Sequence, residues 1–546
     1  MATYAPPGRG PKTVATAGHR GRDMESSGTI RWDRGVAFFC AGEGTLKVPM
    51  SMHAANRSRL LDALRRRKEV PEGAVLLLAG GDEIPVYDTD TNWDYKQESN
   101  FQYLFGVKEP FCRGAICVKD GRSVLFVPNF PQEYAAWMGP IKPPAWYQRA
   151  YEVDEVFYVE LQEMGGEGGQ EEIARVVTSD LDAKALLVLQ SSNRDSGIVP
   201  KRPCLDGLET IPVSEDGSRA LWEELCEARV VKSADELKIM QFANDVTSLA
   251  HVEVMQSKAG QPGQREFVAE ATFRYQAAIR GCPRVGYTCI CPTGPRNAFL
   301  HYGHPAEPNS ETVVLGSLSL RDMGAEYHGY TADVTCTYPV SGRFTEGQRQ
   351  VYEAVWQATL AVEHAIRPGV CYKDMHRLAH RTLLEEMTKA GLFVGQVDDM
   401  MSAELAGYFM FHGLGHSVGL DVHDIGGYAP GVNRKDDPSI KQNLRFGREL
   451  KEGMVITVEP GFYFSDFLIE ELLADEQKAR FVDRQRLEEL RPVGGVRIED
   501  DVVITAAGCR VLTNVPRTVA EVEATMAGQP WSVIAATCRE YHSSPM

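Results

Sequence analysis

The sequence has no long hydrophobic run and no surplus of basic residues. No apolar stretch approaches the ~20 residues that a membrane-spanning helix needs, and none near the start has the form of a signal-peptide core. The formal net charge is −17 at pH 7, which is opposite to the basic surface that nucleic acid or an anionic membrane selects. These absences predict a cytoplasmic protein that binds neither nucleic acid nor membrane.

Cysteine is also scarce in this chain. Twelve cysteines among 546 residues are too few for a disulfide scaffold, and no CxxC pair occurs. The sequence therefore signals neither a zinc knuckle nor a thioredoxin-type redox site. Reduced thiols, as in most cytosolic proteins, are the expected state.

The chain is long enough for more than one domain, since a single core rarely grows beyond about 300 residues. Residues 1–43 are rich in proline and glycine near their start and lack periodicity, which predicts a disordered extension. Its basic residues leave an organelle-targeting segment as an alternative. We predict an N-terminal α/β domain over 44–215, a second domain over 216–528 and a loosely ordered tail over 529–546.

The hydrophobic pattern predicts the elements of each domain. In the first domain it predicts a helix over 57–67 and strands over 74–79, 123–128 and 184–190. Two helices follow, over 218–230 and 233–257, and the second begins with the capping sequence Ser233-Ala-Asp-Glu236.

The second domain alternates helical patterns with runs of β-branched residues. Helices are predicted over 264–280, 346–366 and 372–389, and strands over 312–320, 327–338, 454–459 and 495–505. Helices that cover a mainly antiparallel sheet would give an α+β domain.

Residues 412–424, His-Gly-Leu-Gly-His-Ser-Val-Gly-Leu-Asp-Val-His-Asp, concentrate three of the 13 histidines of the chain. The pair His412 and His416 has the spacing of a zinc-binding helix, but Gly413 and Gly415 would each cost about 1 kcal/mol in a helix interior. The segment is therefore predicted to be a loop or strand whose glycines permit close backbone approach. A glycine-rich surface turn is the alternative.

Four acidic residues lie in or beside apolar, β-branched runs: Asp322, Asp333, Glu459 and Glu499. Burying such a residue is costly unless it is paired or bound to a metal. Each alone could face solvent or form a salt bridge, but four such acids together with His416 favour a shared metal site.

The number of acids indicates the kind of site. Two carboxylates about 4 Å apart repel each other by roughly 4 kcal/mol at an effective dielectric constant near 20, whereas two divalent cations would balance four negative charges. Four carboxylates and one imidazole form an oxygen-rich ligand set that favours Mn²⁺, with Co²⁺ or Zn²⁺ as alternatives. Two such ions can deprotonate a bridging water and polarise a carbonyl group.

Five separated motifs carry a resemblance: Asp322, Asp333, His412-Gly-Leu-Gly-His416, Val458-Glu-Pro-Gly461 and Val496-Arg-Ile-Glu499. In this order and spacing, over about residues 44–528, the chain resembles the pita-bread metallopeptidases, and among them the prolidases. An acidic helical insert near 468–490 separates it from the shorter methionine aminopeptidases. The resemblance implies a creatinase/aminopeptidase P-like N-terminal α/β domain and an α+β pita-bread catalytic domain.

The resemblance also implies roles for individual residues. Asp322, Asp333, His416, Glu459 and Glu499 would bind two divalent metal ions, taken as Mn²⁺, with Asp333 and Glu499 bridging them. Glu459 would also shuttle protons, while His301 and His423 would bind substrate and stabilise the tetrahedral intermediate. The remaining implied roles are a carboxylate clamp at Arg445, a pocket wall at Tyr287, and supporting contacts from His412 and Arg497.

The implied reaction is hydrolysis of Xaa-Pro dipeptides at the imide bond by a metal-activated bridging hydroxide in a homodimeric enzyme. From spacing alone, Arg445 would instead be an ordinary solvated arginine. Two other functions stay open at this point: an aminopeptidase P that acts on longer peptides, and a pita-bread protein that only binds partners.

Overall fold

The computed structural model describes residues 29–160, 169–189, 198–199, 202–429, 432, 444–531 and 540–542. The chain divides into two compact units after Ala228, later than the predicted boundary at 215/216. Helix α6 (Glu215–Val230) accounts for the difference, because it packs against the first unit. Arg67 binds Glu223 at 2.7 Å and Glu224 at 2.9 Å on this helix.

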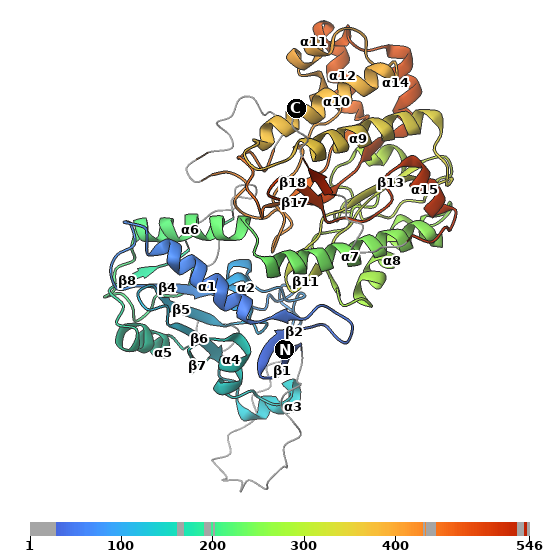
Figure 1. Ribbon diagram of the computed structural model, residues 1–546. Coiled ribbons are helices and arrows are strands. Elements are labelled where there is room, and N and C mark those ends of the chain that lie inside the picture. Colours follow the sequence, from blue (N-terminus) through green and yellow to red (C-terminus); the bar gives the residue numbers. More distant parts are fainter. Residues whose placement is uncertain are drawn as a thin grey trace. The chain divides into compact units, whose positions relative to one another are not determined.

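The first unit contains a five-stranded mixed sheet (Figure 1). Its order is β7 (Glu155–Val159), β6 (Ser123–Pro128), β5 (Arg113–Cys117), β4 (Ala74–Ala79) and β8 (Ala185–Leu187). Strands β4 and β6 have the predicted bounds. The outer pairs β6–β7 and β4–β8 are parallel, and the inner pairs are antiparallel.

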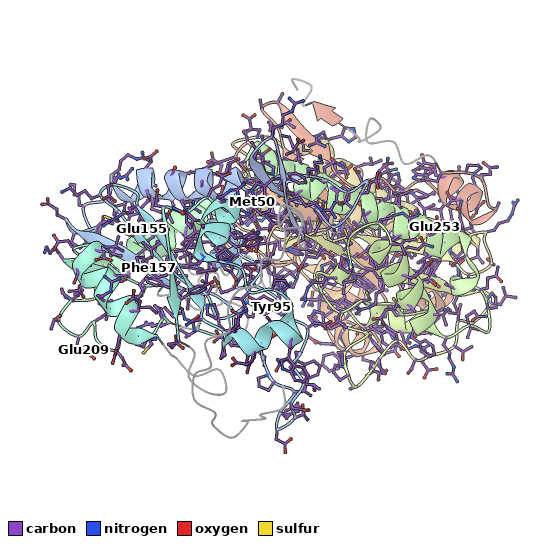
Figure 2. The ribbon with its side chains drawn as sticks, turned by 90° about the horizontal axis from the view of Figure 1, so that it is seen from below. Met50, Tyr95, Glu155, Phe157, Glu209 and Glu253 are labelled. Carbon is purple, nitrogen blue, oxygen red and sulfur yellow. The ribbon has the colours of Figure 1, made fainter. Side chains whose placement is uncertain are left out.

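Helices cover both faces of this sheet. Helix α5 (Gln170–Arg175) and the following turn η3 (Val176–Asp180) share a core with Val75 and Leu77 of β4. Helices α1 (Ser51–Leu64) and α2 (Ser99–Phe105) lie on the other face, where a Cβ on Gly114 of β5 would meet Phe105 at 2.5 Å. Figure 2 labels Phe157 on the edge strand β7, whose ring centroid lies 6.2 Å from that of Phe126. The remaining helices of the unit are η2 (Gln132–Tyr134), α3 (Ala135–Met138) and α4 (Pro144–Tyr151).

The prediction that residues 1–43 are disordered is wrong from residue 29 onward, while residues 1–28 lie outside the described part. Strands β1 (Ile30–Asp33) and β2 (Val36–Phe39) form an antiparallel hairpin, which β3 (Val48–Pro49) extends. Arg34 and Gly35 both have positive φ, as a two-residue hairpin turn requires. Burial of apolar residues in both strands outweighs the loop-like composition around them.

Among the described residues of the second unit, every strand pair is antiparallel. In this described part the pairings form four small sheets, in the orders β10–β13, β12–β11–β9, β14–β17–β18–β19 and β15–β16. The strands are β9 (Arg284–Val285), β10 (Leu318–Asp322), β11 (Ala325–Tyr327), β12 (Tyr330–Thr331), β13 (Thr335–Pro339), β14 (Val455–Val458), β15 (Gly461–Tyr463), β16 (Gly495–Arg497), β17 (Asp500–Ile504), β18 (Gly508–Val511) and β19 (Glu540–His542).

Helices flank these strands, as predicted for an α+β domain. Figure 1 shows strands β13, β17 and β18 of this unit between α9 (Glu346–Ala365) and α10 (Tyr372–Lys389) on one side and α7 (Ala234–Gln256) and α8 (Glu266–Ala278) on the other. Apolar positions of α9 at helical spacing are fully buried in the main core. The other helices of this unit are η4 (Lys258–Gly260), η5 (Gly294–Ala298), α11 (Val397–Ser402), η6 (Leu405–Tyr408), α12 (Asp466–Ala474), α13 (Glu476–Ala479), α14 (Arg484–Leu490), η8 (Arg491–Val493) and α15 (Val519–Met526).

Two features at the ends of this unit test the sequence predictions. The Ser233–Glu236 capping box is present at the start of α7, as predicted. The loosely ordered tail predicted for 529–546 is wrong at residues 540–542, because β19 pairs with β18. Within the described ranges, no helix combines the length and apolar character that crossing a membrane would need.

Candidate metal centre

The five predicted ligands come from different elements of the second unit. Asp322 is the last residue of β10, Asp333 lies between β12 and β13, and Glu459 directly follows β14. Glu499 lies between β16 and β17, and His416 lies three residues before Gly419, in a segment between η6 and β14. Strand ends and connections are where an acidic side chain can leave the hydrogen-bonded ladder and point toward a shared site.

Backbone pairing brings these elements together. Asp322 is the register partner of Thr335 in the β10–β13 pair, and Thr335 forms an isolated bridge with Glu499. On the other side, the Glu459 N–H donates to Leu414 O at 2.9 Å and the Thr457 N–H donates to His416 O at 2.9 Å. The ligands are therefore fixed by β-ladder contacts between segments far apart in sequence.

The side chains of this group converge closely. Asp333, His416 and Glu499 each offer one ligand atom, and these three atoms all lie within 4.8 Å of one another. His416 Nε2 lies 3.3 Å from Asp333 Oδ2 and 3.4 Å from Glu459 Oε1. All three residues of the trio are at most 5% exposed, so bulk water cannot screen their charges.

The hydrogen bond of His416 fits a cation between these groups. His416 Nδ1 lies 3.0 Å from Ser417 O, and because a carbonyl oxygen only accepts, Nδ1 carries the proton. Nε2 then directs its lone pair at the carboxylates of Asp333 and Glu459. Lone pair facing lone pair is repulsive unless a proton or a metal ion lies between them.

The carboxylates of this group repel one another in the same way, and their pKa values show it. Burial, and then the charge of Asp322, raises the pKa of Asp333 well above its ordinary value. Burial, followed by Asp333 and Glu459, raises the pKa of Glu499 in the same way, and burial raises the pKa of Glu459 to about 7. Without cations these carboxylates cannot all ionise near neutral pH. An oxygen-rich set with one imidazole suits hard divalent ions.

Arg497 is the cationic support of the group. It donates to Asp322 Oδ2 at 2.6 Å, to Thr335 Oγ1 at 3.1 Å and to the Tyr463 hydroxyl at 3.0 Å, whereas its Nε lies 4.0 Å from Glu499. The predicted supporting residue is thus present, and its tightest contact is with Asp322.

Three supporting residues were missed in the sequence. Thr335 donates to Glu499 Oε2 at 2.6 Å, and Tyr463 places its hydroxyl 2.9 Å from His412 Nε2. Asp501 accepts the backbone N–H of Asp333 at 3.0 Å. Thr335 follows Asp333 by two residues and Asp501 follows Glu499 by two, so a search for polar residues at i+2 of each ligand could have found both.

His412, predicted as a support, lies 3.8 Å from Glu459 Oε2. Burial lowers its pKa to about 3, so it stays neutral at physiological pH. The neighbouring glycines approach protein backbone: a Cβ at Gly415 would lie 2.2 Å from Thr457 O, and one at Gly413 would lie 2.6 Å from the Cα of Leu444. The prediction of close approach holds, and the partners are neighbouring strands and loops.

The predicted substrate-binding residues surround the same group. Tyr287 donates its hydroxyl to Asp322 Oδ1 at 2.6 Å, and the ring centroid of His423 lies 4.5 Å from that of His416, nearly perpendicular to it. The pKa of His301 is lowered by partial burial and then by the positive charges of Arg445 and Arg497. The charge of Asp322 acts on His301 in the opposite direction, and a site for His301 and Arg445 at the acidic cluster stays a prediction.

Comparison with known proteins places this arrangement in a family. A human Xaa-Pro dipeptidase is 45% identical over 491 residues, which are 90% of this chain and 96% of that protein. The family model described as "Metallopeptidase family M24" matches residues 238–506. The chain belongs to metallopeptidase family M24. As a member of a metal-dependent peptidase family, it uses divalent metal ions, for which the acidic cluster is the candidate site.

Other relatives of this M24 peptidase share both of its units. The "Aminopeptidase P, N-terminal domain" model matches residues 53–164. A probable Xaa-Pro aminopeptidase of Talaromyces marneffei is 33% identical over 479 residues, 87% of this chain and 97% of that protein. The solved aminopeptidase of Pseudomonas aeruginosa is 28% identical, with a TM-score of 0.69 over 88% of this chain and 98% of that chain. These likenesses confirm the predicted pairing of an aminopeptidase P-like α/β domain with a pita-bread domain.

Proposed function

We propose that this M24 peptidase is an Xaa-Pro dipeptidase, which hydrolyses the imide bond of dipeptides that end in proline. The observation that carries the proposal is the convergence of Asp333, His416 and Glu499 within 4.8 Å, beside Asp322 and Glu459. The 45% identity to the human Xaa-Pro dipeptidase supports the substrate class.

In this proposal Asp322, Asp333, His416, Glu459 and Glu499 would hold two divalent ions. The oxygen-rich donor set supports Mn²⁺. When bound, such ions supply a water of low pKa and polarise the scissile carbonyl.

The protein groups supply proton transfer and charge stabilisation. Glu459, whose Oε1 lies 3.4 Å from His416 Nε2, would accept a proton from the attacking water and pass it to the departing proline nitrogen. His423 and His301 would donate to the oxygen of the tetrahedral intermediate. Tyr287, held by Asp322, would form part of the pocket wall.

Arg445 would restrict the enzyme to dipeptides. Its guanidinium, near His301 and Glu459 by their electrostatic influence, would bind the carboxylate of the substrate proline. An Xaa-Pro bond is a tertiary amide without an N–H, so peptidases that position substrates through that donor handle it poorly. Attack at a polarised carbonyl requires no such donor.

The second candidate is an aminopeptidase P, which the fungal and bacterial relatives favour. Rates on Gly-Pro and Gly-Pro-Pro with added Mn²⁺ separate the two, because the dipeptidase prefers Gly-Pro and an aminopeptidase P prefers the tripeptide. A chelated sample should lose the activity, and it should return with added metal. A protein without metal and without turnover would instead fit a pita-bread binding module, which the complete ligand set disfavours.

We further propose that the enzyme is a cytoplasmic homodimer, as the resemblance implies. The net charge of −17 supports the absence of nucleic acid and anionic membrane from its partners. Light scattering coupled to gel filtration would give the mass in solution, and a monomer mass would reject the dimer.

A further inference from the structure

The loop from Phe299 to Glu311, which carries His301, is anchored by buried polar groups. His301 itself is exposed, whereas the next residue, Tyr302, is 1% exposed and Asn309 is 1% exposed. The Tyr302 hydroxyl donates to Glu266 Oε2 at 2.6 Å. Glu266, the first residue of α8, is fully buried.

The Glu266 carboxylate holds both ends of this loop. Its Oε2 also accepts the backbone N–H of Glu311 at 3.2 Å, and the Glu266 N–H donates to Glu311 O at 2.9 Å. Its Oε1 lies 3.5 Å from an Arg296 nitrogen, just before the loop begins. A buried carboxylate with two hydrogen-bond partners in one loop and an arginine just before that loop is a stiff anchor, because moving any of the three would leave a buried polar or charged group uncompensated.

Asn309 connects the same loop to the segment 289–291, which pairs with Asp322. Its side chain donates to Cys289 O at 2.9 Å and accepts the Cys291 N–H at 3.0 Å. Ile290, between these cysteines, exchanges two 2.9 Å backbone hydrogen bonds with Asp322. The loop is therefore in fixed register with the strand end that presents Asp322.

One glycine of this loop also lies close against the segment that pairs with Asp322. Gly303 has a φ of +99°, and a Cβ there would lie 2.4 Å from Cys289 O. His301 is thus followed directly by Tyr302, which is held by Glu266, and then by Gly303, which packs against Cys289 O.

We infer that Glu266 and Tyr302 are positioning residues, which set the location of the His301 imidazole at the active site. The inference rests on the proposed function, in which His301 stabilises the intermediate. It adds two residues, remote from the ligands in sequence, whose hydrogen bond would serve catalysis through His301. Misplacement of such a group by about 1 Å can cost up to about 100-fold in rate.

A double-mutant cycle on the Mn²⁺-loaded full chain tests this role. Tyr302→Phe removes only the hydroxyl, and we expect kcat/KM for Gly-Pro to fall about tenfold in the otherwise unchanged protein. In a His301→Ala background the same change should cost less than about twofold, since the group it positions is already gone.

Tyr330→Phe is the matched control. The Tyr330 hydroxyl donates to the buried Glu236 at 2.9 Å, so this variant also breaks one buried tyrosine–glutamate bond. Its effect on kcat/KM, whatever its size, should be the same with and without His301. A loss for Tyr302→Phe that is likewise the same in both backgrounds would reduce the bond to a structural role and overturn the inference, as would full activity of Tyr302→Phe.

Variants of Glu266 provide the second arm and replace the first if Tyr302→Phe does not fold. Glu266→Gln keeps an oxygen acceptor for the Tyr302 hydroxyl and should keep kcat/KM within about threefold. Glu266→Ala also removes the acceptor of the Glu311 N–H, so it should lower kcat/KM at least as much as Tyr302→Phe, and this loss should be smaller in the His301→Ala background. Equal losses for Gln and Ala would contradict the positioning role. If the unaltered protein does not cleave Gly-Pro, the proposed function itself is refuted. If the unaltered protein is active but the losses from Tyr302→Phe and His301→Ala are independent of each other, only the positioning role is refuted.

Discussion

Glu459→Gln should have opposite effects on activity and on the stability of the metal-free protein. The Glu459 carboxylate is 15% exposed and lies 3.4 Å from His416, and burial raises its pKa from 4.5 to about 7. A raised carboxylate pKa means that the folded state holds its proton more tightly than the unfolded state does. The contribution of this group to stability is therefore complete below pH 4.5 and is lost as pH rises to 7.

The size of the effect follows from the two pKa values. Between pH 4.5 and pH 7 the unfolded state gives up its proton first, which costs the folded state about 3 kcal/mol by pH 8 and about 1 kcal/mol at pH 5. Gln carries no charge at either pH. In chelator at pH 8, Glu459→Gln should thus raise the free energy of unfolding by about 3 kcal/mol, and the gain should shrink at pH 5.

Urea unfolding of the two proteins in excess chelator at pH 5 and pH 8 measures this difference. Glu133→Gln, at an exposed glutamate of the first unit, controls for the loss of one charge and should leave the difference between the two pH values unchanged. With saturating Mn²⁺ the order should reverse, because metal binding stabilises only the form with the complete ligand set, and the variant should have no turnover. If Glu459→Gln is less stable than the unaltered chain in chelator at pH 8, the electrostatic account of the site is wrong.

Three further predictions follow from the described contacts. Asp322→Asn should lower kcat/KM at least about 1000-fold, since it removes a ligand charge; steady-state rates with saturating Mn²⁺ would show this, and retained turnover would count against the ligand assignment. Arg445→Ala should raise KM for Gly-Pro about tenfold to 100-fold, the value of a charged hydrogen bond, while leaving KM for Gly-Pro-Pro nearly unchanged; equal shifts would reject the clamp. The pKa of buried His53 is lowered to about 3, chiefly by burial, so between pH 7 and pH 5 only the unfolded state gains its proton and stability falls by about 2 kcal/mol. His53→Gln, which keeps a donor for Tyr103 O, should remove that part of the pH dependence of the urea midpoint, and an unaltered pH slope would disprove it.

Local patterns were sufficient for much of the fold. Strands β4 and β6 and helix α10 have the predicted bounds, because a short apolar run between turns and a heptad-like apolar stripe are both encoded within the segment itself. The start of α7 was predictable for the same reason, since its cap is formed by residues three apart. The proposed ligand side chains were selected because acids within β-branched runs are costly to bury, and their roles come from the resemblance alone.

Contacts between distant segments were beyond local reasoning. Thr335 and Glu499 are 164 residues apart, so the spacing from Asp333 could have marked Thr335 as a candidate, but only the folded structure shows that its hydroxyl binds Glu499. The β1–β2 hairpin was missed because glycine and proline upstream dominated the composition, although Arg34-Gly35 is a plausible turn. The boundary was placed too early because the sequence of α6 does not reveal that its partner is Arg67.

The scattered origin of the ligands along the polypeptide has a consequence for biosynthesis. Glu499 is synthesised 177 residues after Asp322. Until Glu499 has left the ribosome, the hydrogen bond from Thr335 to its carboxylate cannot form. A nascent chain that ends before Glu499 therefore lacks one of the proposed metal ligands. Metal capture should therefore follow the pairing of the Glu499 segment with Thr335, so that uptake of the ion reports that this segment has folded into place.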